Sequence, residues 1–300
     1  MIGLVLTAVV GSGTLAAAHG SGPGGTTTAD AALALHHAAG APTSGAAASR
    51  GPVVAPAPVG PDGVPVAVRE VLTAAGGSVS VAVFDAVSGR TWSADDRGGQ
   101  VEASLSKLQI LGAWLRDEQA GRAESGQISA NLRAMIGSSS NTAASVLFSL
   151  VGRSGLTAFT TDLGVSVGAG SQGHFGLDTT SAADQVTIMK AFAYPNSVLT
   201  EASRAHAETL LANVEDDQHW GVSGGVPTGV DVDLKNGWLP FTSGWVVNSV
   251  GHVSGAGRDY VVAILSSGNA TEPAGIDRLQ AVSAAVWATS AAKSAASAAA

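Results

Sequence analysis

The chain has 300 residues, of which 45% are hydrophobic and only 13% are charged, so it can bury a full core, and its formal net charge is −8. This acidic balance argues against a nucleic-acid partner and against an anionic membrane, because both are bound through basic patches. The absence of cysteine excludes a disulfide framework, a thiolate metal site and a lipidated cysteine.

The first 65 residues do not have the composition of a folded domain. Residues 2–18 form an apolar run that ends in three alanines, as at a signal-peptide cleavage site, although basic residues before the run are missing. Residues 19–65 are dominated by Gly, Ala, Pro, Ser and Thr, which predicts a disordered linker. We therefore expect a signal peptide at 1–18, export from the cell, and a folded domain at 66–292, followed by an alanine-rich tail at 293–300.

Hydrophobic periodicity predicts the elements of this domain. Residues 66–75 predict a helix, and residues 78–95 predict a hairpin whose first strand is largely buried. From about 102 to 225 the apolar side chains recur at three- and four-residue steps, which is typical of helices. The helices are expected at 104–120, 127–136, 141–151, 155–163, 181–193 and 199–213.

The period changes again at Val232. Residues 233–240, 244–255 and 258–268 predict three strands, and residues 275–291 predict a closing helix. Two strands, a block of helices, three strands and a helix are typical of an α+β protein in which an antiparallel sheet carries a helical insertion.

The candidate chemistry begins at Ser104, which opens a predicted helix. Lys107 lies three residues later and so about one turn away on the same face. A serine hydroxyl is a weak nucleophile unless a base takes its proton, and an amine in an apolar site is neutral often enough to do so. The Ser104 amide could also stabilise an oxyanion, because the first N–H groups of a helix lack partners. The pattern alone is weak, since it recurs at Ser290 to Lys293.

Three further stretches fit this serine–lysine pair. Ser139–Asn141 falls in the break between two predicted helices, and Lys235–Gly237 lies on a predicted strand. Thr179 and Thr180 are expected to cap the helix that follows them. Each stretch also has a purely structural interpretation, as a capping loop, a solvated strand-end lysine or a helix start.

In chain order the motifs read SLSK, SSN and KNG. They resemble the S-x-x-K, S-D-N and K-T-G set of class A β-lactamases and penicillin-binding proteins, and the similarity runs from about 78 to 291. The chain looks most like the β-lactamase-like serine hydrolases that actinobacteria export. The resemblance implies an α/β/α sandwich, in which helices flank a five-stranded antiparallel sheet and an all-helical subdomain is inserted at about 102–225. It also implies a monomer without cofactor or metal.

The resemblance implies four catalytic side chains. Ser104 would be the acylated nucleophile and Lys107 its activating base. Ser139 would pass a proton to the leaving nitrogen. Lys235 would attract the substrate carboxylate and tune the proton of Ser139. The substrate would be a small β-lactam or a peptidoglycan stem peptide.

The resemblance also implies four substrate-binding positions. Asn141 would hold the acyl side chain, and Asn236 would donate a hydrogen bond to a carboxylate. Gly237 would let substrate lie along the strand edge without a Cβ in the way. The amide of Trp238 would be the second oxyanion donor, beside that of Ser104.

Three differences separate the chain from a standard class A enzyme. Ser140 replaces an aspartate that braces its loop, and Asn236 replaces a threonine. The glutamate that activates the deacylating water is missing, because the loop VGAGSQGHFGLD, which ends at Asp178, contains none. His174 or Gln172 could position a water instead. Without a general base, deacylation is expected to be slower by about two to four orders of magnitude.

Other functions stay open at this point. Two G-x-S-x-G matches, around Ser166 and Ser223, do not lie at strand-to-helix elbows, and no H-E-x-x-H metal motif is present. A D-alanyl-D-alanine peptidase or penicillin-binding protein would use the same serine chemistry. A non-catalytic cell-wall or ligand-binding module would explain the lost glutamate, but binding alone would not require the pair Ser104 and Lys107.

Overall fold

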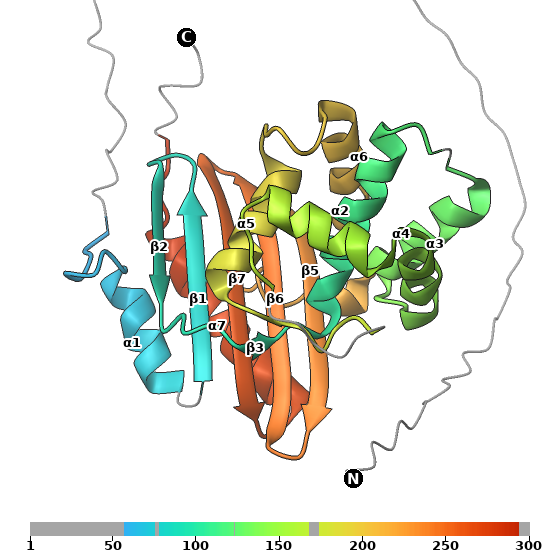
Figure 1. Ribbon diagram of the computed structural model, residues 1–300. Coiled ribbons are helices and arrows are strands. Elements are labelled where there is room, and N and C mark those ends of the chain that lie inside the picture. Colours follow the sequence, from blue (N-terminus) through green and yellow to red (C-terminus); the bar gives the residue numbers. More distant parts are fainter. Residues whose placement is uncertain (1–56, 76–77, 123, 168–173, 294–300) are drawn as a thin grey trace, which may run out of the picture. The chain divides into compact units, whose positions relative to one another are not determined.

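The computed structural model describes residues 57–75, 78–122, 124–167 and 174–293 (Figure 1). The predicted signal peptide, residues 19–56 of the predicted linker, and residues 294–300 of the predicted tail lie outside these ranges. Val59 forms an isolated bridge with Pro65, and Val64 is buried in the core. The folded unit therefore begins before residue 66, the predicted boundary.

One five-stranded antiparallel sheet forms the centre, in the order β2-β1-β7-β6-β5. The predicted hairpin consists of β1 (Ser78–Asp85) and β2 (Arg90–Ala94). The predicted C-terminal strands are β5 (Asp231–Phe241), β6 (Gly244–Gly255) and β7 (Arg258–Asn269). Because β7 pairs with β1, segments from both ends of the folded unit build a single sheet.

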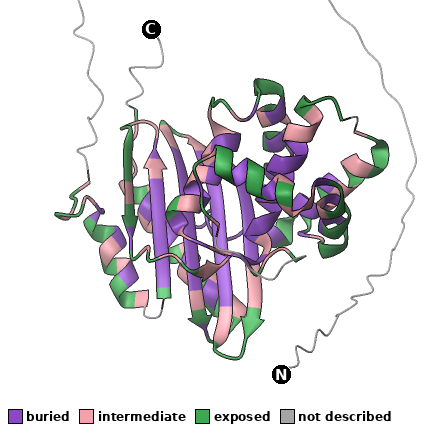
Figure 2. Ribbon diagram, viewed as in Figure 1, coloured by how far each residue is buried: buried purple, intermediate pink, exposed green. Residues whose placement is uncertain are grey.

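Alternate residues of the central strands enter two different cores, as the two-residue period of a strand requires. In β7, Val261, Ala263 and Leu265 pack among the helices of the insertion. Tyr260, Val262 and Ile264 pack on the opposite side of the sheet. Burial on both faces explains why these strands read as continuous apolar runs, and Figure 2 shows the central strands as the buried part of the molecule.

Helices cover both faces of the sheet. On one face, α1 (Val66–Ala75) contacts α7 (Glu272–Thr289), which packs on β6 and β7. On the other face, α5 (Ala182–Ala193) contacts β1, β6 and β7. The rest of the helical block lies on that side (Figure 1), and it contains α2 (Ser106–Gln119), α3 (Gly126–Gly137), α4 (Asn141–Asp162) and α6 (Glu201–Leu211). The predicted α/β/α sandwich with a helical insertion is confirmed.

The predicted caps at Thr179 and Thr180 are wrong. These residues form β4 (Thr179–Thr180), which pairs with β3 (Gln100–Val101) in a separate two-stranded ladder. The helix cap is Ser181, whose hydroxyl accepts a hydrogen bond from the Asp184 amide at 3.0 Å. Two-residue strands carry no periodic signal, so this ladder could not be predicted from the sequence.

Helix α4 spans the two helices predicted at 141–151 and 155–163. At Gly152, where φ is +67° and ψ is 172°, the backbone leaves helical geometry, so α4 kinks at the predicted break. Among the described residues it is also the one helix that is long and apolar enough to cross a membrane by length and composition alone. Ala144, Leu147 and Phe159 are fully buried in the helical core, as expected of a core helix.

Candidate active site

Ser104 lies on a tight turn that leads into α2. The turn is the 3₁₀-helix η1 (Ala103–Leu105), and Ala103 adopts a φ of +51°. The Leu105 amide donates to the carbonyl of Glu102 at 3.2 Å, and Asn248 on β6 donates to the same carbonyl at 3.2 Å. The turn is therefore held both from within and from the sheet. Ser104 itself is half-buried and accessible.

Lys107 links the nucleophile to the start of α4. Its Nζ lies 2.6 Å from Ser104 Oγ, 2.8 Å from the Ser139 carbonyl and 2.8 Å from Asn141 Oδ1. The side chain is fully buried. Burial in this low-dielectric site lowers the pKa of Lys107 to about 8. A substantial fraction of the amine is therefore neutral near pH 8, as a general base requires.

Ser139 bridges the two lysines. Its Oγ lies 3.1 Å from Lys107 Nζ and 3.0 Å from Lys235 Nζ. Ser139 has a φ of +56°, an uncommon conformation for a residue with a Cβ. The neighbouring Ser140 caps α4 by accepting from the Ala143 amide at 3.2 Å. The loop that the aspartate braces in the class A pattern is thus held here by a helix cap.

Lys235 is buried next to Ser139, and its Nζ also donates to the Asn236 carbonyl at 2.9 Å. Burial and the charge of Lys107 hold the pKa of Lys235 well below its usual range. Ionisation of one amine therefore disfavours ionisation of the other.

Asn236 and Gly237 lie on a strand, β5, as predicted, but each has contacts that the sequence did not indicate. The Asn236 amide nitrogen already donates to the carbonyl of Gln218 at 2.6 Å, so the side chain braces the turn η2 (Asp216–Gln218). At Gly237, an added Cβ would lie only 2.9 Å from the Ser104 amide nitrogen. Gly237 thus allows β5 to approach the nucleophile turn closely. Trp238 follows on β5, with its ring edge against Trp220.

The loop before β4 contacts the nucleophile turn from the other side. The Glu102 amide donates to the Asp178 carbonyl at 2.9 Å, and the Ala103 amide donates to the Gly176 carbonyl at 3.0 Å. Arg153 of α4 forms an ion pair with the buried carboxylate of Asp178. His174 is exposed, and Gln172 lies outside the described residues.

The structure brings Ser104, Lys107, Ser139, Asn141 and Lys235 together through direct contacts. Sequence reasoning missed Glu102, Arg153 and Asn248. These residues support the cluster through contacts with the nucleophile turn or with the loop that packs against it. An acid inside an apolar stretch next to Ser104 was the one available signal for Glu102.

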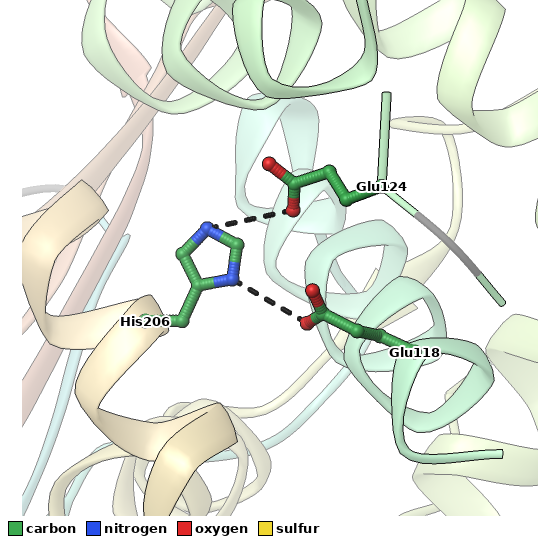
Figure 3. Close-up of side chains that lie close together, drawn as sticks. All are labelled: Glu118, Glu124 and His206. Atoms are coloured by element: carbon green, nitrogen blue, oxygen red, sulfur yellow. Dashed lines mark hydrogen bonds and ion pairs between the residues drawn. The ribbon is translucent and has the colours of Figure 1, made fainter. Parts of the chain in front are cut away.

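A separate group could offer ligands to a metal ion. His206 of α6 lies between Glu118 and Glu124 (Figure 3), and one ligand atom from each residue lies within 4.8 Å of the others. However, its Nδ1 faces Glu118 at 3.4 Å and its Nε2 faces Glu124 at 3.8 Å. A single ion would bind one of the two nitrogens, so this arrangement suits an imidazole between two acids better than a metal centre.

The profile of the β-lactamase enzyme family matches residues 127–290, more than half of the chain. The chain belongs to this family. A comparison with curated proteins gives no match. The family's fold is also found among solved structures. A variant of the last common ancestor of Gram-negative class A β-lactamases has a TM-score of 0.64 at 22% identity, over 74% of this chain and 97% of the other.

Two further solved members of this fold have similar scores. The class A β-lactamase of Mycobacterium abscessus has a TM-score of 0.63 at 21% identity, over 74% of this chain and 96% of the other. PBP-A has a TM-score of 0.63 at 19% identity, over 74% and 94%. Membership of this family makes the protein a hydrolase of the β-lactamase type.

Proposed function

We propose that this protein is a serine hydrolase that forms an acyl-enzyme on Ser104 with β-lactams or related peptide amides, and that it deacylates slowly. The observation that carries the proposal is the 2.6 Å contact between Lys107 Nζ and Ser104 Oγ, in a site where burial lowers the pKa of the amine to about 8. A neutral amine at this distance can accept the hydroxyl proton as the oxygen attacks.

Acylation would proceed with a balanced transfer of protons. Neutral Lys107 takes the proton of Ser104, and the serine oxygen bonds to the amide carbonyl carbon. The amides of Ser104 and Trp238 stabilise the oxyanion, since β5 approaches the serine amide at Gly237. When the C–N bond breaks, Ser139 gives its proton to the leaving nitrogen and regains one from a neighbouring ammonium group.

Slow deacylation follows from the missing base. The loop from 167 to 178 contains no glutamate, and within the described residues the exposed side chain of His174 forms no hydrogen bond, ion pair or ring contact. General bases contribute about 10²–10⁴-fold, so the acyl-enzyme is expected to persist. An acyl-enzyme complex with penicillin G has been solved for a mutant of PBP-A, a protein of the same fold.

The physiological substrate is proposed to be a small β-lactam or a peptidoglycan stem peptide. Lys235 would attract its carboxylate, and Asn141 would hold its acyl side chain. Asn236 would contribute less than the equivalent threonine, because one of its N–H groups is taken by Gln218. A D-alanyl-D-alanine peptidase fits the same site. The apolar run at 2–18 supports export to the envelope, where such peptides occur. The protein is proposed to act there as a monomer.

Labelling with a fluorescent penicillin tests the proposal. The parent should be labelled, and both Ser104→Ala and Lys107→Ala should lose the label. Lys293→Ala is the matched control, because it removes the lysine of the second Ser-x-x-Lys while leaving the site intact. If Lys107→Ala is labelled at the parental rate, the assignment of the base is wrong. If neither the parent nor any variant is labelled, the non-catalytic binding module becomes the better interpretation.

A further inference from the structure

A second buried acid lies under the nucleophile turn. Glu102 is two residues before Ser104 and has no exposed surface. Its Oε1 accepts hydrogen bonds from Gln109 Nε2 of α2 at 2.6 Å and from Gln185 Nε2 of α5 at 3.1 Å. Gln185 Nε2 also donates to Thr180 Oγ1 at 3.2 Å. The carboxyl group thus joins α2 to α5, and Gln185 extends the contact to β4.

Two oxygens in this cluster have no donor. Within the described residues, Glu102 Oε2 and Gln185 Oε1 are both buried and lack any hydrogen-bond partner. A buried acceptor that is left without a donor destabilises the fold. An ionised carboxylate oxygen and an amide oxygen can only accept hydrogen bonds, so neither can satisfy the other unless one of them carries an additional hydrogen. The two groups are already joined by the bond from Gln185 Nε2 to Glu102 Oε1 at 3.1 Å, so a proton on the acid could close a second bond between the same two groups.

We propose that Glu102 is a neutral carboxylic acid whose Oε2–H donates to Gln185 Oε1, and that this closed acid–amide pair positions the Ser104 turn. One proton satisfies both orphaned oxygens and completes a ring of two hydrogen bonds between the acid and the amide.

The charges around Glu102 favour the neutral acid. Asp178 and Asp184 are acidic neighbours, and the nearby guanidinium of Arg153 is paired with Asp178. Among the described residues no cation forms an ion pair with Glu102. Burial, with the charge of Asp178 adding to it, raises the pKa of Glu102 to about 8.

The backbone of Glu102 connects this pair to the nucleophile. Its amide donates to the Asp178 carbonyl, and its carbonyl accepts from Leu105 and Asn248. The next residue, Ala103, has the left-handed φ of +51° that turns the chain toward Ser104. Ionisation of Glu102 would remove the donor to Gln185 and place a second negative charge beside Asp178. Glu102 is therefore a positioning residue.

Stability against pH tests the protonation state without any use of activity. Glu102→Gln carries an amide that can replace the neutral acid but cannot titrate. The folded pKa near 8 exceeds the unfolded value of 4.5, so stability is fully present below 4.5 and is lost as pH rises to 8. The unfolding constant of the parent relative to Glu102→Gln should therefore rise about tenfold per pH unit between pH 5 and 8 and then level off.

Glu208→Gln is the matched control, since Glu208 is exposed on α6. The unfolding constant of the parent relative to this control should not change with pH. A flat ratio for Glu102→Gln as well would overturn the proposal. The parent protein provides a measurement that needs no variant. In protein labelled with ¹³C-glutamate, the infrared C=O stretch of a protonated glutamic acid should be present at pH 7. Its absence from the folded protein would also overturn the proposal.

The positioning role rests on the proposed function and is tested by acylation with benzylpenicillin. Glu102→Gln should acylate within about threefold of the parent rate at pH 7, whereas Glu102→Ala should acylate at least tenfold more slowly. Above pH 8 the ratio of the parental rate to the Glu102→Gln rate should fall, because only the parent can lose the proton of Glu102. If Glu102→Gln is as slow as Glu102→Ala, the neutral acid is not what positions the turn. If the parent itself is not acylated, the proposed function fails while the stability and infrared results still decide the protonation state.

Discussion

Replacing Gly237 by alanine should separate β5 from the nucleophile turn. A Cβ at this position would lie 2.8 Å from the Glu102 carbonyl oxygen and 2.9 Å from the amide nitrogens of Ser104 and Leu105. All three are backbone atoms, which cannot rotate away as the end of a side chain can. The strand and the turn must therefore move apart as units.

The size of the effect follows from these distances. Contacts at 2.9 Å must open to 3.4 Å, where ordinary van der Waals contact begins, which is a displacement of about 0.5 Å. Overpacking of this kind costs about 1–3 kcal/mol, equivalent to a fall in Tm of roughly 2–12 °C for a domain of this size. A misplacement of about 1 Å can cost about 10²-fold in rate, so acylation should slow about tenfold.

Two assays measure these changes. Thermal unfolding gives the change in Tm, and the time course of intact mass with benzylpenicillin gives the acylation rate. Gly126→Ala is the matched control, because Gly126 starts α3 without a positive φ, and an added Cβ would meet no atom within 4 Å. A Gly237→Ala variant that keeps both the parental Tm and the parental acylation rate would refute this account of the turn.

Three further predictions concern ionisation and proton transfer. The acylation rate of Glu102→Gln, which cannot titrate at position 102, should rise as pH increases through about 8, because deprotonated Lys107 is the active base; a rate that falls over this range contradicts the assignment. Ser139→Ala should slow acylation by about 10²-fold or more, measured by the same mass assay, since both lysines lose their shared hydroxyl. Burial would lower the pKa of His252, but the hydrogen bonds of this residue to Asp233 and Asp259 raise that pKa above 6.5. The stabilisation by protonated His252 is therefore complete below pH 6.5, and it is lost as pH rises through the raised pKa. The Tm advantage of the parent over His252→Gln should therefore shrink with rising pH, and a growing advantage would contradict this ion-pair arrangement.

Most of the fold could be predicted because its elements repeat a simple period. The strands at 244–255 and 258–268 and the helix at 66–75 match the structure to within a residue. The break between the predicted helices at 141–151 and 155–163 also matches, because the backbone leaves helical geometry at Gly152. The prediction failed for β3 and β4, because strands of two residues are too short to show a period.

The candidate site could be predicted as a set of residues but not as a set of orientations. Motif order was sufficient to select Ser104, Lys107 and Ser139, which the structure places in direct contact. The direction of the Asn236 side chain depends on a carbonyl 18 residues away in the chain. The role of Glu102 depends on Gln185, which is 83 residues away. Partners at such separations leave no pattern in a single sequence.

The most direct test of the central claim is the intact mass of the protein over time after mixing with benzylpenicillin, with Ser104→Ala measured in parallel. The account predicts an adduct of one penicillin on the parent that persists for many times its formation time, and none on Ser104→Ala. An adduct that decays as fast as it forms would contradict slow deacylation. No adduct on the folded parent, or the same adduct on Ser104→Ala, would contradict the acyl-enzyme itself.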